Sequence, residues 1–275
     1  MITLGVDIGS LTGKAVVLKD DQILAWDMIL TGADSVETGT SVTRNALGKA
    51  GLTLEDMSCV VSTGYGRVVI PFANKNISEI TCHAKGAHWL VPTARTILDM
   101  GGQDCKAISC DEHGKVQSFL MNDKCAAGAG RSMGIVADLL GMPLDEVGPE
   151  SLLAEGGPVP ISSTCVVFAR SEILAYLRQG VPRARVLAGA CEALCHRVKS
   201  QLQRVGVQQD FVISGGIARN VGVVRRLEEQ LGLAAHIPAD PQIVGALGAA
   251  VLARELLEKQ GTRRSRRARD SGEPG

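Results

Sequence analysis

The stretch DIGSLTGKA, from Asp7 to Ala15, recurs 92 residues later as DMGGQDCKA, from Asp99 to Ala107. Four of the nine aligned positions are identical, and the alignment needs no gap. In each copy an apolar stretch precedes the aspartate and a second one follows the lysine, which is typical of two strands joined by a glycine turn. Because self-similarity within a chain marks repeated structural units, the sequence predicts two homologous halves.

The residues around each copy predict a three-stranded meander followed by helices and further strands. In the first half the meander is ITLGVDI, KAVVLK and ILAWDMIL, and a helix at 35–50 precedes a buried strand at 59–64. In the second half, strands at 106–110 and 115–122 complete the meander. Beyond it the predicted elements are helices at 126–140, 166–179 and 184–205, a Gly- and Pro-rich loop at 148–160, a strand at 211–216, and helices at 221–231 and 245–257.

Each glycine turn is a candidate phosphate-binding element, because free backbone N–H groups without a nearby Cβ can approach phosphate oxygens. The aspartate before each turn, Asp7 or Asp99, suits a hydrated Mg²⁺, which prefers carboxylates and water. One such turn alone would fit a structural hairpin better than a phosphate site. The duplication reverses this preference and favours a clamp on nucleotide phosphates across a cleft. The predicted contacts are Ser10, Leu11, Thr12, Gly13 and Lys14 in the first turn, and Gly101, Gly102 and Gln103 in the second.

The two turns differ in the residues suited to orient an attacking water. The second has Gln103 and Asp104 where the first has Leu11 and Thr12, so the polar pair is the predicted water-positioning set. Gln103 is the first choice, because glutamine can orient water without accepting its proton.

A third glycine-rich strand end lies in ISGGIARN, where Gly215 and Gly216 precede a predicted helix and Asn220 stands at its start. Helix N-termini bind anions through free N–H groups and the helix dipole, so these residues are predicted nucleotide contacts. The chain contains no GxxxxGK[ST] sequence, which excludes a P-loop.

The composition is that of a globular protein, with 45% apolar and 21% charged residues. Aromatic residues make up only 3%, which argues against a base-stacking nucleic-acid surface. No apolar run is long enough for a membrane span and no cleavable leader is evident, so we expect a cytoplasmic protein with reduced thiols. Five arginines in 261–275 make that segment basic, and we expect a short, solvated, disordered tail to which we assign no function. Contact with an acidic partner is the alternative.

The segments DIGSLTGK, STGYGR, DMGGQD and SGGIARN resemble the phosphate, connecting and adenosine segments of the actin, Hsp70 and sugar kinase superfamily. The resemblance covers about residues 2–257 and implies an α/β protein with a duplicated ribonuclease H-like, two-domain ATPase fold. The implied halves are 1–92 and 93–260, and the last helix is also compatible with packing back on the first half. Within this superfamily, NDKCAAGAGR, SSTCVVFARSE and GALGAA look closely like the ATPases that activate 2-hydroxyacyl-CoA dehydratases and their benzoyl-CoA reductase relatives.

The closer resemblance implies a [4Fe–4S] cluster bridged across a homodimer, with Cys125 and Cys165 as the two ligands from each chain. Both cysteines precede a predicted helix, where the helix dipole lowers a thiol pKa. The resemblance also places nucleotide contacts at Gly128 and Gly130. Cys191 and Cys195, four residues apart, are interpreted as core residues, as are Cys59, Cys82, Cys105 and Cys110 on or near strands. His83 and His88 are five residues apart, a poor spacing for one helix face, and receive no metal assignment.

The implied activity is ATP hydrolysis coupled to electron transfer, in which a ferredoxin or flavodoxin is the donor and an acyl-CoA dehydratase or reductase component is the acceptor. ATP, ADP and Mg²⁺ are the implied ligands, and neither nucleic acid nor a membrane is an expected partner. Three alternatives stay open: the ATPase subunit of a benzoyl-CoA reductase, a small-molecule kinase of the same superfamily, and an iron-free actin-like scaffold. A kinase would need a substrate pocket in inserted subdomains, and no sufficiently large insertion is evident.

Overall fold

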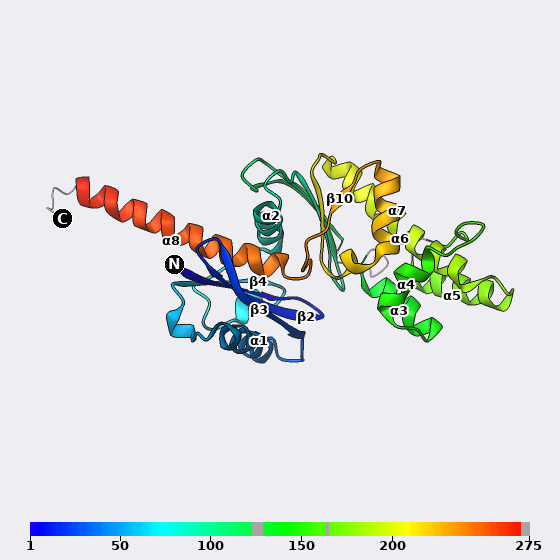
Figure 1. Cartoon of the computed structure of the whole chain (residues 1–275), viewed down its shortest axis with the longest axis horizontal. Helices are drawn as coiled ribbons and strands as arrows, with labels where there is room; N and C mark the ends of the chain where they lie inside the picture. The colour runs from blue at the N-terminus through cyan, green and yellow to red at the C-terminus, as the bar shows by residue number, and fades with distance from the viewer. Residues whose placement is uncertain (123–128, 163–164, 271–275) are drawn as a thin grey trace. The chain divides into compact units, whose positions relative to one another are not determined.

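The computed structural model describes residues 1–122, 129–162 and 165–270, with side chains in the last helix as far as Thr262. The chain forms two compact units. The first comprises Met1–Trp89 and the C-terminal segment that begins at Ile243, and the second comprises Leu90–Gln242. In Figure 1 the first unit is drawn in blue, cyan and orange to red, whereas the second runs from green to yellow.

The first unit contains a five-stranded sheet with the order β3-β2-β1-β4-β5. The three N-terminal strands form an antiparallel meander, and β1 also pairs in parallel with β4. The strands are β1 (Ile2–Ile8), β2 (Thr12–Lys19), β3 (Gln22–Leu30), β4 (Cys59–Gly64) and β5 (Lys75–Asn76), and the helices are α1 (Ser35–Ala50), α2 (Glu79–Leu90) and α8 (Val244–Asp270).

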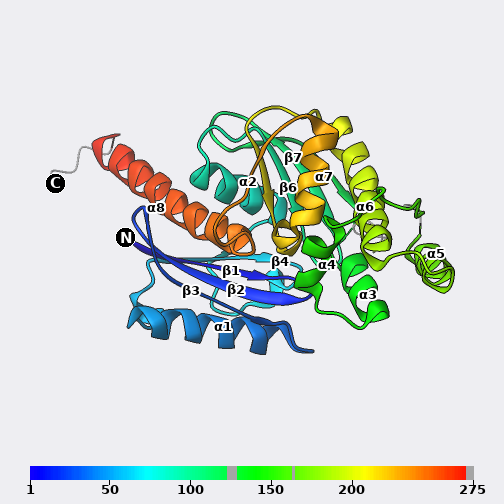
Figure 2. The same ribbon diagram turned by 45° about the vertical axis from the view of Figure 1, so that its right-hand side comes forward.

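Both faces of the first sheet are buried by helices (Figure 2). Side chains alternate along a strand, so Ala15 and Val17 of β2 pack with α1, whereas Val16 and Leu18 pack with α8. Asp34 caps the N-terminus of α1, and its carboxylate accepts hydrogen bonds from two backbone N–H groups. Gly51, in the left-handed conformation, caps the C-terminus. The first β-meander is therefore held between α1 and α8.

The second unit repeats the same sheet, with the order β10-β9-β6-β7-β8. Asp7 pairs with Lys14 across β1 and β2, and Asp99 pairs with Lys106 across β6 and β7, at the offset found in the sequence. The duplicated ribonuclease H-like fold is thereby confirmed. The strands are β6 (Thr96–Met100), β7 (Cys105–Cys110), β8 (Val116–Asn122), β9 (Phe211–Ser214) and β10 (Ala235–His236), and the helices are α3 (Arg131–Leu140), α4 (Leu144–Ser151), α5 (Val166–Arg178), α6 (Arg183–Val205) and α7 (Val221–Leu231).

Several elements differ from the sequence-based predictions. The predicted loop at 148–160 begins inside α4, which starts after Pro143 and has Asp145 and Glu146 in its first turn, where carboxylates favour a helix. Cys82 lies on α2, where it packs in one buried cluster with Cys59 and Val61 of β4. The backbone of α8 stays helical as far as Asp270. The helix thus extends beyond residue 261, where the tail was expected to begin.

The apolar start of α8 packs against β1 and β4 of the first sheet, and its Ala246, Leu247 and Ala250 are fully buried there. In the part of the chain that the structure describes, no helix is both long and apolar enough to cross a membrane.

Candidate functional site

The first glycine turn is preceded by a buried ion pair at the end of β1. Lys14 Nζ lies 3.3 Å from Asp7 Oδ2, and both side chains are largely buried. Gly9 N–H donates to the Thr12 carbonyl at 3.0 Å and closes the turn. The Thr31 hydroxyl donates to the Gly9 carbonyl at 2.9 Å, so the end of β3 holds the turn from outside. A fixed turn with a carboxylate and an ammonium behind it suits a metal-bound polyanion.

The second turn has the same hydrogen bond and the same ion pair. Gly101 N–H donates to the Asp104 carbonyl at 3.0 Å, and Lys106 Nζ lies 3.3 Å from Asp99 Oδ2. Here the lysine also lies 2.7 Å from Asp104 Oδ2, and the Ser214 hydroxyl donates to Asp99 Oδ1 at 3.0 Å. The second turn thus has an additional buried carboxylate, at the position that Thr12 occupies in the first.

A left-handed glycine follows the neighbouring strand in both units. Gly64 after β4 and Gly215 after β9 both have φ of 82°. A Cβ on Gly64 would lie 2.4 Å from Asp7 Oδ1, and one on Gly215 would lie 2.9 Å from Asp99 Oδ1. Both the conformation and the close approach require glycine. The strand end therefore approaches each carboxylate so closely that a side chain at either glycine would collide with it. A carboxylate beside a glycine turn is the kind of ligand that a hydrated Mg²⁺ prefers.

The predicted contact residues fall into exposed, half-buried and buried groups. Leu11 and Gln103 are exposed at equivalent turn positions, whereas Gly13 and Asp104 are buried. Since Asp104 is paired with Lys106, its carboxylate is held in the ion-pair network while Gln103 is open to solvent. Ser10, Thr12, Gly101, Gly102 and Gly130 are half-buried, and Gly216 is exposed.

Asn220 serves as the N-cap of α7, where its side-chain oxygen accepts from Val223 N–H at 3.0 Å. The side-chain nitrogen of Asn220 is buried and makes no hydrogen bond among the described residues. A Cβ on Gly148 would lie 2.6 Å from the Asn220 oxygen, so α4 packs closely on this cap. Asn220 therefore acts as a helix cap in this structure, and the nucleotide contact predicted there stays a prediction.

The second turn is hydrogen-bonded to the start of α3. Gly130 N–H donates to the Gly101 carbonyl and Arg131 N–H donates to the Gly102 carbonyl, both at 2.9 Å. A Cβ on Gly130 would lie 2.9 Å from the Gly101 oxygen, so the contact is close. Because two backbone hydrogen bonds fix the turn to α3, a displacement of one would move the other.

The support that α2 gives to β4 was not predicted from the sequence. Arg67 donates from one guanidinium nitrogen to the Gly64 carbonyl at 2.9 Å and to Glu79 at 3.0 Å. Glu79 is the first residue of α2, so this ion pair connects the helix to the left-handed glycine. Arg67 belongs to the STGYGR segment, but nothing in the local sequence identifies Glu79 as its partner.

Cys165 differs from the other described cysteines in its burial. It is the half-buried N-cap of α5, whereas Cys59, Cys82, Cys105, Cys110, Cys191 and Cys195 are buried. Burial raises the pKa of the Cys82 thiol to about 12 and also raises the pKa values of Cys191 and Cys195. These thiols stay protonated at neutral pH and are poor metal ligands.

The predicted ligand Cys125 and the predicted contact Gly128 lie outside the described residues. No group of three metal-ligating side chains occurs among the residues that are described.

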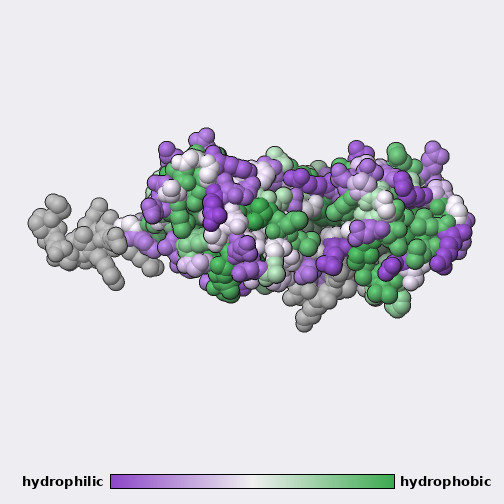
Figure 3. All heavy atoms as spheres, turned by 90° about the horizontal axis from the view of Figure 1, so that it is seen from below, coloured by the Kyte–Doolittle hydropathy of each residue, from purple (hydrophilic) through white to green (hydrophobic). Residues whose placement is uncertain are grey.

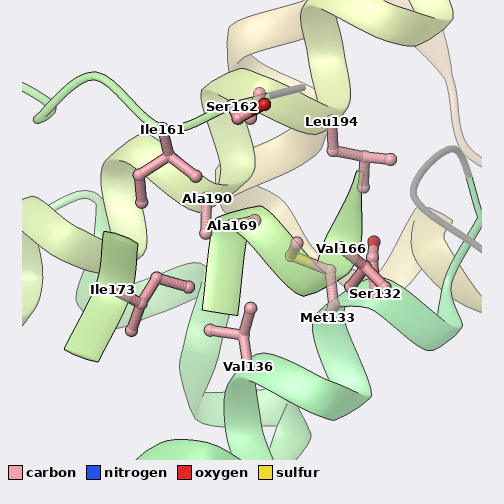
Figure 4. Close-up of a pocket in the computed structure, with 11 residues that line it drawn as sticks. Ser132, Met133, Val136, Ile161, Ser162, Val166, Ala169, Ile173, Ala190 and Leu194 are labelled. Atoms are coloured by element: carbon pink, nitrogen blue, oxygen red, sulfur yellow. The ribbon is translucent and has the colours of Figure 1, made fainter. Parts of the chain in front are cut away.

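A pocket lies between α3, α5 and α6 of the second unit (Figure 4). Its lining is mainly apolar and includes Met133 and Val136 of α3, Ala169 and Ile173 of α5, and Leu194 of α6. Within α5, all of whose residues the structure describes, only Ile173 is buried. Val167 and Phe168, in the first turn of α5, are 64% and 63% exposed. Helix α5 is therefore lightly packed on its own unit.

Exposed apolar side chains are not confined to α5. Val68 and Val69 in the first unit and Leu153 in the second are also exposed. Figure 3 shows hydrophobic areas among the hydrophilic ones on the face that it draws.

Comparisons with known proteins found relatives in sequence and in structure. The activator of lactoyl-CoA dehydratase from Anaerotignum propionicum is 46% identical over 264 residues, which is 94% of this chain and all of that protein. The structure of the activator of the 2-hydroxyisocaproyl-CoA dehydratase from Clostridium difficile with bound ADPNP superposes with a TM-score of 0.89 at 40% identity, over 96% of this chain and 98% of that one.

A more distant relative is a subunit of the benzoyl-CoA reductase of Thauera aromatica, 30% identical over 91% of this chain and 92% of that protein. Residues 4–253 match the family described as BadF/BadG/BcrA/BcrD ATPase, and this range spans both glycine turns and the segment from Gly215 to Asn220. The chain belongs to the BadF/BadG/BcrA/BcrD ATPase family, and its enzymatic activity is that of an ATPase.

Proposed function

We propose that this ATPase activates a 2-hydroxyacyl-CoA dehydratase by passing it a low-potential electron from a [4Fe–4S] cluster shared by two copies of the chain. Cys125 and Cys165 of each copy would hold the cluster, which supplies one-electron chemistry when bound. A ferredoxin or flavodoxin would be the electron donor. Support comes from the 46% identical relative named as a dehydratase activator and from the placement of Cys165.

The placement of Cys165 is the observation that carries this proposal. A cluster ligand must be a thiolate that another chain can approach, and Cys165 is the half-buried cysteine among the described ones. It stands at the N-terminus of a 13-residue helix, whose dipole would stabilise an anionic cluster bound there. The other described cysteines offer no alternative cluster ligand, since their thiols are buried and widely distributed over both units.

For the nucleotide, we propose contacts by both glycine turns and a Mg²⁺ ion held through the Asp7 and Asp99 carboxylates. Lys14 and Lys106 would offset negative charge at each turn. Gln103, exposed at the tip of the second turn, is the candidate that orients the attacking water. The ADPNP in the structure of the 40% identical relative supports nucleotide binding by this fold.

Coupling between the nucleotide and the cysteines would pass through α3. The carbonyls of Gly101 and Gly102 accept hydrogen bonds from the residues at the start of α3, and α3 lines the apolar pocket together with α5. A shift of the second turn on hydrolysis would move α3 and, through Met133 and Val136, the lightly packed α5 that begins after Cys165. Differential nucleotide binding to two states typically supplies about 1–3 kcal/mol for such coupling.

Iron analysis of anaerobically purified protein tests the cluster and its stoichiometry. Two ligands per chain require about four irons per dimer, hence about two per chain. Cys125→Ser and Cys165→Ser should each abolish the cluster and leave the fold intact, whereas the buried-thiol control Cys191→Ser should keep it. Four irons per chain, or a cluster that persists in Cys165→Ser, would contradict the assignment.

The ATPase subunit of a benzoyl-CoA reductase is a second candidate function, favoured by the 30% identity to the Thauera aromatica protein. The same residues would act in both cases, and the acceptor enzyme differs. Reconstitution separates the two, because an activator makes a purified 2-hydroxyacyl-CoA dehydratase active in the presence of ATP and reductant. Failure with a dehydratase together with ATP-dependent electron transfer to a benzoyl-CoA reductase component would favour the second candidate.

A further inference from the structure

His83 is a buried polar residue of α2 that lies close to the aspartate of the first glycine turn. Its side chain belongs to a helix that sequence analysis did not predict, and only 6% of the residue is exposed. Buried histidines are generally held by specific polar neighbours, because their ring nitrogens are costly to desolvate. The position of His83 therefore calls for an explanation in terms of the groups around it.

Gly245, near the start of α8, locates His83 relative to Asp7. A Cβ on Gly245 would lie 2.8 Å from His83 Nε2 and 3.1 Å from Asp7 Oδ2. The imidazole nitrogen and the carboxylate oxygen thus flank the same point. Asp7 Oδ2 is also the oxygen that faces Lys14, while Oδ1 faces Gly64.

The backbone packing around α2 leaves His83 little freedom to move away. A Cβ on Gly248 would lie 1.8 Å from the Cys82 carbonyl, and one on Gly86 would lie 2.1 Å from the Val244 carbonyl. The two helices therefore touch through their backbones on both sides of His83. Such contacts hold a helix more closely than contacts between long side chains would.

The two units support their aspartates differently. In the second unit the Ser214 hydroxyl donates to Asp99 Oδ1. Thr63 occupies the same register position beside Asp7, yet its hydroxyl makes no hydrogen bond to that carboxylate in the described structure. Asp7 therefore has no hydroxyl donor equivalent to the one that Ser214 gives Asp99 in the described structure. The imidazole of His83, from α2, lies near Asp7.

We propose that His83 is a positioning residue for Asp7, holding its carboxylate through Nε2 in the orientation that binds a hydrated divalent cation with the nucleotide. The inference rests on the proposed role of Asp7 in nucleotide binding. Hydrogen bonds of this kind are often long in a ligand-free site and shorten in the complex. Lys14 and Glu79 are charged groups close to the same region, from β2 and from the preceding turn of α2.

Binding measurements on the full-length chain test the role of His83. We expect His83→Ala to weaken the Mg²⁺-dependent part of ATP affinity roughly tenfold, measured by calorimetry with Mg²⁺ and with EDTA, while the affinity in EDTA is unchanged. In steady-state kinetics the change should fall on KM for Mg·ATP. His83→Gln, whose side-chain amide can reach the place of Nε2, should restore most of the affinity.

Three further variants make the result decisive. His88→Gln alters the other histidine of α2 and should behave as wild type. Gly245→Ala should reproduce the His83→Ala defect, because its methyl group would enter between the two side chains, and it replaces His83→Ala if that variant does not fold. Asp7→Asn should lose Mg²⁺-dependent affinity.

If Asp7→Asn is impaired while His83→Ala and Gly245→Ala bind as wild type, His83 has no such role and the nucleotide site stands. If Asp7→Asn itself binds normally, the proposed nucleotide role of the first turn is wrong.

Discussion

At the residue scale, Asp99 has more described polar partners than Asp7, the equivalent aspartate of the first turn. It faces Lys106, accepts from Ser214 and lies beside Gly215. Asp99→Asn keeps the shape and a hydrogen-bond acceptor but removes the charge that a metal ion needs. We expect ATPase kcat/KM to fall at least tenfold, a change of about 1.4 kcal/mol.

Asp145→Asn, an exposed carboxylate on α4, is the matched control and should leave hydrolysis unchanged. Wild-type turnover in Asp99→Asn would remove Asp99 from the nucleotide site. Thermal unfolding of both variants shows whether a loss of activity comes from a loss of fold.

The ion pairs at the turns could be predicted from sequence, because aspartate and lysine recur at one offset and antiparallel pairing places them opposite each other. The neighbouring residues that complete the site at each glycine turn could not be predicted from sequence. Ser214 reaches Asp99 across β9, and Glu79 reaches Arg67 from the start of α2. Such contacts depend on parallel pairing and helix packing between distant segments, which local patterns do not encode.

At the element scale, α2 and α8 are held together by glycines. α2 was not predicted because small residues such as Ala84 and Gly86 form much of its buried face and give little contrast in hydrophobic periodicity. The same small residues allow the close helix contact described above. In contrast, the buried face of α6 includes large apolar residues such as Leu187, Leu194 and Leu202, and the predicted start of α6 lies within one residue of the observed one.

This packing makes opposite predictions for two glycine substitutions. Gly248→Ala should destabilise the protein by about 3 kcal/mol or more, because its Cβ would overlap the Cys82 carbonyl. Gly48→Ala on the exposed side of α1 has nothing within 4 Å of its Cβ and should stabilise by about 0.5–1 kcal/mol. The midpoint temperature of thermal unfolding measures both changes in stability. Equal effects of the two substitutions would show that α2 and α8 do not pack as described.

For the whole molecule, the division into units makes a prediction about fragments. The second unit is one continuous segment with its own core, which includes Leu98, Leu187 and Phe211. The first unit needs α8, because Ala246 and Leu247 fill the space against Val16 and Leu18. A fragment of residues 90–242 should therefore unfold cooperatively by circular dichroism, and residues 1–89 alone should not.

A chimera that joins residues 1–89 to residues 243–262 through a flexible Gly/Ser linker should restore cooperative unfolding. The control is the same chimera with Leu247→Asp, which places a charge in the core and should remain unfolded. Cooperative folding of residues 1–89 without α8 would show that the C-terminal helix is dispensable for the first unit.

The position of α8 in the chain also bears on biosynthesis. A ribosome makes the five strands of the first sheet before the second unit, and it makes the helix that covers β1 only after that unit. At translation rates of about 5–20 residues per second, the sheet waits roughly ten to thirty seconds for its missing layer. The first unit is thus completed after the second unit, although its synthesis begins earlier. While α8 is still missing, the apolar face of the first sheet depends on the nascent-chain environment for protection from aggregation.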